Sequence, residues 1–300
     1  MKLLITTQTM DERDPVLGFF VRWIEEFAKH VGHIEVICLT EGTYKLPANV
    51  CVHSLGKEKG VSRVKYILNF YRYIWRLRHD YDTVFVHMNP EYVVLGGFFW
   101  RLWNKRIALW YTHKSVDLKL RVAAHMADII LTASKESFRL ASKNVRVMGH
   151  GIDTDFFSPD TQVVRGDWIL SVGRLMKSKR HDLAIQKAKQ DGRALRIAGE
   201  GPERTSLGVL ASELNVKAQF LGALTQTQLR DEYRTAAYFI HTSETGSLDK
   251  VVLEALACGL PVRTNDPALK ALENVNPTYI REHHSLQRLI PAILNVIRTV

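Results

Sequence analysis

Two basic side chains follow an apolar run in the second half of the chain, at a spacing that suits a diphosphate. Trp168–Val172 is predicted to be a buried strand, and Arg174 and Lys179 lie in the segment directly after it. An arginine fork and a lysine point charge can both bind one diphosphate group. Basic loops after strands are also common, so this spacing alone leaves open a diphosphate site and an ordinary solvated loop.

A later stretch combines a strand, a loop and a helix in an order that suits anion binding. Phe239–His241 end an apolar run, Thr242–Ser247 are small or polar, and Leu248–Cys258 has apolar residues at helical spacing. Ser247 is predicted to be the N-cap, and Gly259-Leu260-Pro261 to end the helix. The N-terminus of such a helix offers free backbone N–H groups and a positive dipole end to an anion.

Glu254 lies about two turns into this predicted helix. Its carboxylate can accept hydrogen bonds from hydroxyl groups on the molecule that carries the anion. The same spacing is typical of any α/β crossover unit, in which Glu254 would be a solvated surface residue. The pattern by itself leaves both interpretations open.

The elements that must position these residues alternate short apolar runs with helical patterns, which is typical of parallel sheets with crossover helices. The predicted strands of the first half are 2–6, 34–39, 50–53, 83–87, 107–111 and 129–132, with a helix at 16–30. The second half has predicted strands at 168–172, 195–198, 218–221 and 237–241, and helices at 203–214, 225–234, 248–258, 267–273 and 286–297. No GxGxxG follows the first strand, which disfavours a dinucleotide-dependent oxidoreductase.

Three motifs in this order resemble the group 1 (family 4) retaining glycosyltransferases: GRLMKSK (173–179), GEGP (199–202) and LEALACGLPV (253–262). The segment VRVMGHGIDTDFFSP (145–159) is similar to the interdomain segment of that family. The resemblance implies an α/β protein with the GT-B architecture, in which two Rossmann-like domains flank an interdomain cleft. The expected domains are an acceptor domain at 1–155 and a nucleotide-sugar donor domain at 156–300.

The resemblance also implies roles for individual residues. Arg174 and Lys179 would act on the donor diphosphate, His113 would face the donor sugar, and Glu254 would contact the ribose. The other implied donor contacts are Gly18, which lets the backbone approach the diphosphate, Gly199 and Gly201 near the nucleotide, and Ser247 and Leu248 at the helix start. The reaction would be hexosyl transfer with retention, by front-face attack in which the leaving phosphate oxygen takes the acceptor proton.

One position departs from the family pattern. The family places a first glutamate at the position of Gly246, where this chain has no carboxylate. Glu244 or Asp249 is predicted to reach the same space. The missing carboxylate also motivates an alternative, a protein of the same fold that binds a sugar nucleotide but has lost catalysis.

Neither a cofactor nor a metal is expected. Cys38, Cys51 and Cys258 are widely spaced, odd in number and without a CxxC pair, which argues against a zinc site or disulfide framework and favours a reducing compartment. The N-terminal segment turns polar too soon for a signal peptide, and no apolar run is long enough to span a bilayer. The expected location is cytoplasmic.

The formal net charge is +10, and residues 57–121 carry thirteen Lys or Arg against five Asp or Glu. Such a surface attracts nucleic acid, anionic lipid or phosphorylated substrates. No nucleic-acid-binding motif accompanies it, so nucleic acid is not a predicted partner. Two aromatic, basic helices at 61–79 and 90–103 either pack on the sheet with their arginines at the rim or form a peripheral surface on anionic membrane. The second interpretation suits a glycan or lipid-linked acceptor.

Overall fold

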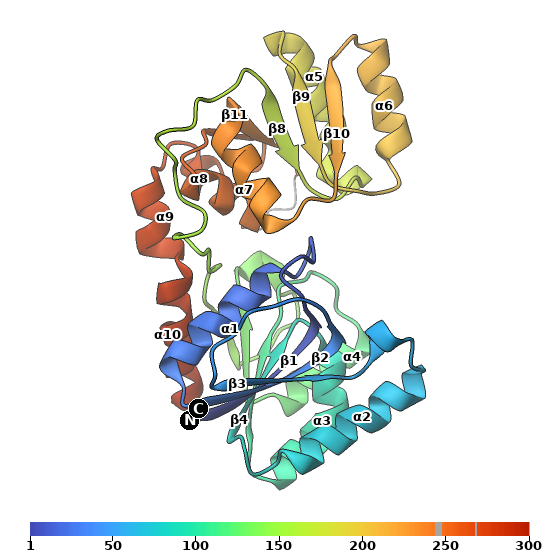
Figure 1. Cartoon of the computed structure of the whole chain (residues 1–300), viewed down its shortest axis with the longest axis vertical. Coiled ribbons are helices and arrows are strands. Elements are labelled where there is room, and N and C mark those ends of the chain that lie inside the picture. The colour runs from blue at the N-terminus through green and yellow to red at the C-terminus, as the bar shows by residue number, and fades with distance from the viewer. Residues whose placement is uncertain (244–247, 268, 300) are drawn as a thin grey trace. The chain divides into compact units, whose positions relative to one another are not determined.

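The computed structural model describes residues 1–243, 248–267 and 269–299, which divide into two compact units. One unit comprises Met1–Gly149 and Gln287–Val300, and the other comprises His150–Leu286 (Figure 1). The prediction of a second domain at 156–300 is wrong at its C-terminal end, because helix α10 (Leu286–Arg298) belongs almost entirely to the first unit. The sequence shows that one side of this helix is apolar, but it does not show which core buries that side.

The described residues of the first unit form a sheet of seven parallel strands in the order β3-β2-β1-β4-β5-β6-β7. The strands are β1 (Lys2–Met10), β2 (His33–Glu41), β3 (Val50–Ser54), β4 (Thr83–His87), β5 (Arg106–Trp110), β6 (Ile129–Thr132) and β7 (Val145–Val147). The helices are α1 (Phe19–His30), α2 (Arg63–Arg76), α3 (Pro90–Leu102), α4 (Leu118–Met126) and α10, with short 3₁₀ turns at Lys57–Lys59 and Lys135–Ser137.

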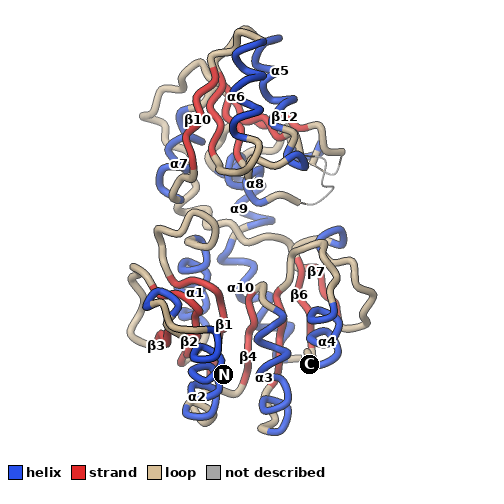
Figure 2. Tube along the Cα trace, turned by 90° about the vertical axis from the view of Figure 1, so that its right-hand side faces the viewer, coloured by secondary structure: helices blue, strands red, loops and turns tan. Residues whose placement is uncertain are grey.

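The alternation of side chains along each strand decides which helices cover which face of this sheet. Val84 and Val86 of β4 pack with side chains of α2, α3 and α4 in one core. Phe85, between them, points the other way and meets Phe27 of α1 with ring centroids 5.2 Å apart. Helices α1 and α10 therefore lie on one face and α2, α3 and α4 on the other, as Figure 2 also shows.

The second unit holds a five-stranded parallel sheet in the order β10-β9-β8-β11-β12 among its described residues. The strands are β8 (Ile169–Val172), β9 (Leu195–Ala198), β10 (Ala218–Gly222), β11 (Tyr238–His241) and β12 (Val262–Thr264). The helices are α5 (His181–Asp191), α6 (Arg204–Glu213), α7 (Gln226–Thr235), α8 (Lys250–Ala257) and α9 (Pro277–His284), with 3₁₀ turns at Lys177–Lys179 and Lys270–Leu272. One core gathers side chains of α5 and α6, and a second gathers those of α7, α8 and α9.

The expected pair of Rossmann-like α/β units is confirmed, and several local predictions are wrong, including the start of α1, which is Phe19 rather than residue 16. Strand β1 continues to Met10 rather than ending at residue 6. The helix predicted at 267–273 is a 3₁₀ turn over Lys270–Leu272, with residue 268 outside the described residues. Helix α8 begins at Lys250 rather than at residue 248.

Helix α2 buries only one of its apolar sides. Phe70 is buried toward the sheet, whereas Val64, Ile67 and Trp75 are exposed. Helix α3 begins with Pro90 at its first turn, as predicted, and exposes Phe98. Both helices therefore pack one side against the sheet, as the first interpretation expects, and each also leaves apolar side chains exposed.

Candidate donor site

The strand order of the second unit places a ligand crevice at one point of its sheet. From β8 the chain adds β9 and β10 on one side, then returns to add β11 and β12 on the other. Ligands of open α/β sheets bind where the strand order reverses, outside the carboxyl ends of the strands. Here that point lies between the segment after β8 and the segment after β11, which hold the predicted site residues.

Lys179 and Asp249 join these two segments. The Nζ of Lys179 lies 2.8 Å from Oδ2 of Asp249, and Nε2 of His241, at the end of β11, lies 2.9 Å from the same oxygen. The hydroxyl of Thr242 also donates to the carbonyl of Lys179 at 2.9 Å. The cation predicted from the segment after β8 therefore does face the N-terminus of α8.

Asp249 remains a carboxylate although it is largely buried. Burial disfavours its charge, but the hydrogen bond with His241 and the charge of Lys179 outweigh that cost and lower the pKa well below its ordinary value. Asp249 occupies the N-cap position of α8, yet no side-chain capping bond is made. The carboxylate is turned toward Lys179 and His241 instead, and the helix begins at Lys250.

Arg174 differs from Lys179 in its surroundings. Its side chain is exposed, and it makes no hydrogen bond or ion pair with the part of the chain that the structure describes. An exposed cation is available to an anionic ligand. Its action on a diphosphate stays a prediction.

Gly199 and Gly201 let two loops at the sheet edge touch. A Cβ on Gly199, whose φ is +144°, would lie 2.0 Å from the carbonyl oxygen of Gly173, and one on Gly201 would lie 2.3 Å from that of Leu175. The backbone N–H of Leu175 donates to the carbonyl of Glu200 at 2.9 Å. Both glycines therefore shape the segment that carries Arg174, and their contact with a nucleotide stays a prediction.

Glu254 is buried, so the alternative of a solvated surface residue is wrong. It is 1% exposed, and the hydroxyl of Tyr233 donates to its Oε2 at 3.4 Å. The Nζ of Lys250, one turn earlier on α8, lies 2.7 Å from Oε1, an electrostatic contact rather than a well-aligned hydrogen bond. A ribose would have to share this carboxylate with Lys250.

The remaining predicted donor contacts of this region divide into two groups. Leu248 is half-buried and packs on the core formed with α7, α8 and α9. Glu244, Gly246 and Ser247 lie outside the described residues, so the replacement of the missing carboxylate by Glu244 stays a prediction. The prediction of Ser247 as the N-cap is wrong, because Asp249 holds that position.

Two histidines of the second unit support the site and were not predicted. His241 is 3% exposed, and its Nδ1 lies 3.1 Å from the hydroxyl of Thr264. His181, the first residue of α5, is equally buried beside Gly173, with Nδ1 3.0 Å from the hydroxyl of Ser171. Burial lowers the pKa of His181 to about 4, so the ring is neutral near pH 7. The available signal is positional, since His241 ends β11 and His181 begins the helix that follows β8.

His113 and Gly18 belong to the first unit, at the carboxyl ends of its strands. His113 is exposed after β5, and its Nδ1 accepts a hydrogen bond from the backbone N–H of Ser115 at 3.1 Å. Gly18 precedes α1, and a Cβ there would lie 2.6 Å from the carbonyl oxygen of Asp14, so the preceding loop can fold tightly beneath it. A depression of about 360 Å³ is lined by both His113 and Leu17, the neighbour of Gly18.

Comparison with known proteins agrees with this geometry. Residues 156–281 match the family model of the glycosyl transferases group 1. The chain is 28% identical over 187 residues to the sulfoquinovosyl transferase SQD2 of Arabidopsis thaliana, covering 58% of this chain and 35% of that protein. It is 29% identical to N-acetylgalactosamine-N,N'-diacetylbacillosaminyl-diphospho-undecaprenol 4-alpha-N-acetylgalactosaminyltransferase of Campylobacter jejuni, covering 47% of this chain and 42% of that protein. The matches thus span well under half the length of these curated relatives.

The fold extends over the whole chain. The structure of the Anabaena protein HepE in complex with UDP is similar with a TM-score of 0.72 and 15% identity, covering 100% of both chains. The same protein in complex with UDP-glucose gives a TM-score of 0.67. Residues 156–281 therefore belong to the group 1 glycosyl transferases, and the chain has the two-domain GT-B fold of glycosyltransferases.

Proposed function

We propose that this protein transfers a hexosyl group from a nucleoside-diphosphate sugar to an acceptor, with retention and without a catalytic metal. The observation that carries the proposal is the position of Lys179, which faces the N-terminus of α8 at the point where the strand order reverses. A diphosphate bound there meets a lysine, the exposed Arg174 and the positive end of a helix dipole.

The chemistry follows from these groups. The bond between the anomeric carbon and the phosphate oxygen breaks, and the charge that develops on the diphosphate is stabilised by Lys179 and Arg174. An acceptor hydroxyl attacks from the same face, and its proton passes to the leaving phosphate oxygen. His113 is proposed to contact the donor sugar, and Glu254 to accept hydrogen bonds from the ribose hydroxyls.

Two internal ion pairs set a condition on donor binding. Asp249 forms an ion pair with Lys179, and Lys250 forms one with Glu254. The charges of Lys179 and Glu254, the two predicted donor contacts, are therefore already compensated within the second unit. A diphosphate competes with Asp249 for Lys179, and a ribose competes with Lys250 for Glu254. The donor must therefore supply enough new interaction to replace these pairs.

The test is a panel of UDP-, GDP- and ADP-sugars, measured by thermal shift and then by release of the nucleoside diphosphate. A bound donor raises the melting temperature by mass action. We expect at least one donor to stabilise the protein and to be turned over. Stabilisation by none of them would overturn the proposed donor site.

The second candidate is a sugar-nucleotide-binding protein with little or no catalysis. The absence of a glutamate at position 246 favours it. The same panel separates the candidates, because binding without turnover, in the presence of varied acceptors, supports the second.

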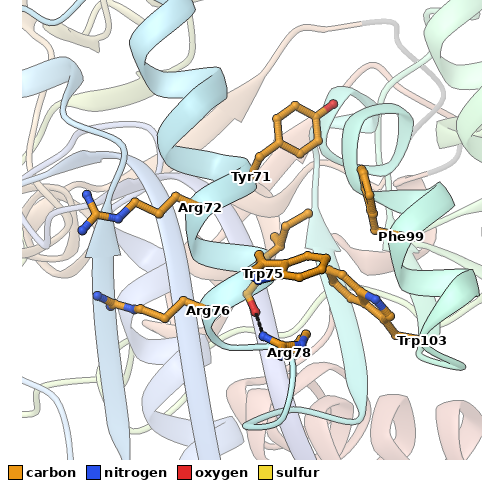
Figure 3. Close-up of a pocket in the computed structure, with 8 residues that line it drawn as sticks. Tyr71, Arg72, Trp75, Arg76, Arg78, Phe99 and Trp103 are labelled. Carbon is orange, nitrogen blue, oxygen red and sulfur yellow. Dashed lines mark hydrogen bonds between the residues drawn. The ribbon is translucent and has the colours of Figure 1, made fainter.

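For the acceptor we propose a lipid-linked molecule, presented at an anionic membrane on which α2 and α3 rest. An aromatic–basic groove of about 670 Å³ lies between these helices (Figure 3) and is lined by Tyr71, Arg72, Ile74, Trp75, Arg76, Arg78, Phe99 and Trp103. Trp75, Phe99 and Trp103 face the space between the helices, whereas Arg72 and Arg76 extend from the other side of α2. Among the described residues, no helix is both long and apolar enough to cross a bilayer.

Exposure and charge favour anionic lipid as the occupant of this surface. Trp75 is 56% exposed, Phe98 65% and Leu102 66%. Helix α2 carries four basic residues and no acidic one, and the guanidinium of Arg78 stacks 4.8 Å from the ring centroid of Trp75. Interfacial aromatics with a basic flank are typical of surfaces that lie in the headgroup region. The Campylobacter relative, by its name, acts on a diphospho-undecaprenol-linked sugar, which supports an acceptor of this class.

A further inference from the structure

Three side chains that can bind a metal converge on the edge of the first unit's sheet. His33 and Glu35 lie on β2 and Cys51 lies on the edge strand β3. One ring nitrogen of His33, one carboxylate oxygen of Glu35 and the sulfur of Cys51 all lie within 4.8 Å of one another. None of them is among the predicted donor contacts.

The register of the two strands produces this cluster. Glu35 pairs directly with Cys51 across the parallel ladder, and His33 precedes Glu35 by two residues. Residues two apart on a strand point to the same face, and paired residues on neighbouring strands do as well. Backbone hydrogen bonding therefore holds all three side chains on one face of the sheet.

A second histidine orients the carboxylate. Nε2 of His33 lies 2.8 Å from Oε1 of Glu35, and Nε2 of His53 lies 2.6 Å from Oε2. Burial raises the pKa of Glu35, but the hydrogen bonds to His53 and His33 outweigh it and lower the pKa below its ordinary value. Glu35 is 5% exposed, whereas Cys51 lies at the surface. The cluster is therefore buried at Glu35 and open to solvent at Cys51.

We propose that His33, Glu35 and Cys51 bind one Zn²⁺ ion, with water in the fourth position. Imidazole nitrogen, carboxylate oxygen and thiolate sulfur are the ligands that zinc takes in proteins, at about 2.0–2.3 Å. Tetrahedral geometry at these lengths separates the ligand atoms by about 3.5 Å, which small side-chain rotations reach from the present arrangement. The thiol of Cys51 releases its proton when the metal binds. His53 acts as a positioning residue, because its ring holds Oε2 of Glu35.

The ion would link the edge strand β3 to β2. Edge strands are held on one side only, and a ligand that binds the native state alone stabilises it by mass action. The site is separate from the proposed sugar transfer, which needs no metal. The wide spacing of the cysteines argues only against a zinc site built from cysteines. Here β2 supplies two ligands of other types, the imidazole of His33 and the carboxylate of Glu35.

The experiment is a titration of the purified full-length protein with Zn²⁺ against a chromophoric chelator. We expect one ion per chain, and Co²⁺ in its place should show a thiolate-to-metal charge-transfer band. Cys51→Ser and His33→Asn should each weaken Zn²⁺ binding at least tenfold, and Cys51→Ser should abolish the band. His53→Gln should weaken binding about tenfold without removing the band. His125→Ala, an exposed histidine of α4, is the matched control and should bind as the unaltered protein does.

A hydrogen-bonded His–Glu–His network does not need the cysteine, whereas the metal site does. Zn²⁺ should therefore raise the melting temperature of the unaltered protein and leave that of Cys51→Ser unchanged. Melting temperatures in EDTA establish that the variants are folded. The proposal is overturned if the unaltered protein does not bind Zn²⁺ in competition with the chelator, or if Cys51→Ser or His33→Asn binds Zn²⁺ as tightly as the unaltered protein.

Discussion

The Nζ of Lys179 and Oδ2 of Asp249 are 2.8 Å apart, so the lysine predicted to meet a diphosphate already holds a carboxylate at the start of α8. The pair is only partly exposed, with 25% and 17% of the two side chains accessible. Each partner thus limits what the other can bind. An incoming diphosphate must displace Asp249 or recruit Lys179 alongside it.

Asp249→Asn should tighten the binding of UDP, because it removes an internal competitor for Lys179 and a negative charge near the diphosphate. A partly exposed ion pair is worth about 1 kcal/mol, so we expect the Kd to fall roughly three- to tenfold. Isothermal titration calorimetry with UDP measures the change. If Asp249 instead contacts the donor sugar, UDP binding is unaltered and binding of the intact sugar nucleotide weakens.

Arg174→Ala and Lys179→Ala should each lower kcat by about a hundredfold, with a smaller change in KM. The reason is that both cations stabilise charge that develops only as the sugar–phosphate bond breaks. Steady-state kinetics with the donor found in the panel measures both constants. Lys177→Ala, an exposed lysine of the same loop, is the control. Undiminished turnover in both site variants would contradict their assignment.

Glu254→Gln should weaken the binding of ligands that contain ribose and spare those that do not. We expect about a tenfold higher Kd for UDP, because the carboxylate's hydrogen bonds to the hydroxyls are roughly 1.5 kcal/mol stronger than those of an amide. Inorganic pyrophosphate, which contacts only the cations, is the comparison ligand. Equal losses for UDP and pyrophosphate would show that the variant disturbs α8 rather than the ribose contact.

Stability should fall between pH 6.5 and pH 4, partly through His181. Burial lowers the pKa of this ring from 6.5 to about 4, so below pH 6.5 the unfolded chain binds a proton that the folded chain excludes. Protons therefore favour unfolding, by about 3 kcal/mol once the pH has reached 4. Urea unfolding at several pH values, followed by tryptophan fluorescence, should show a shallower decline for His181→Asn than for the unaltered protein. His125→Ala, at an exposed site, should decline as the unaltered protein does.

Trp75→Ser combined with Phe98→Ser should reduce binding to anionic vesicles at least tenfold, because both side chains are more than half exposed on α2 and α3. Co-sedimentation with vesicles of phosphatidylcholine, with and without phosphatidylglycerol, measures the loss. Val209→Ser, at an exposed apolar position of α6, is the control and should bind normally. Binding that is insensitive to salt and to anionic lipid would falsify the proposed membrane contact.

Several predictions from the sequence rest on patterns among residues that are close together along the chain. The order of strands and helices follows from apolar periodicity, and the stretch from Gly173 to Lys179 was placed correctly after a buried strand. The prediction that α8 begins at residue 248 is two residues early, since the N-cap is Asp249. The carboxylate of Asp249 makes no capping bond and instead contacts Lys179 and His241, from segments that are distant in the sequence.

The sequence by itself determined the alternation that builds two parallel sheets, the glycines at 199 and 201, and the basic residues after β8, since each depends on neighbours within a few positions. Only the tertiary structure decided which charges are already paired, that Glu254 is buried beside Tyr233, that α10 joins the first unit, and that Cys51 lies opposite Glu35. The physical reason is that pairing and burial depend on which strands lie side by side, and strand order is set by the packing of whole faces rather than by any one segment.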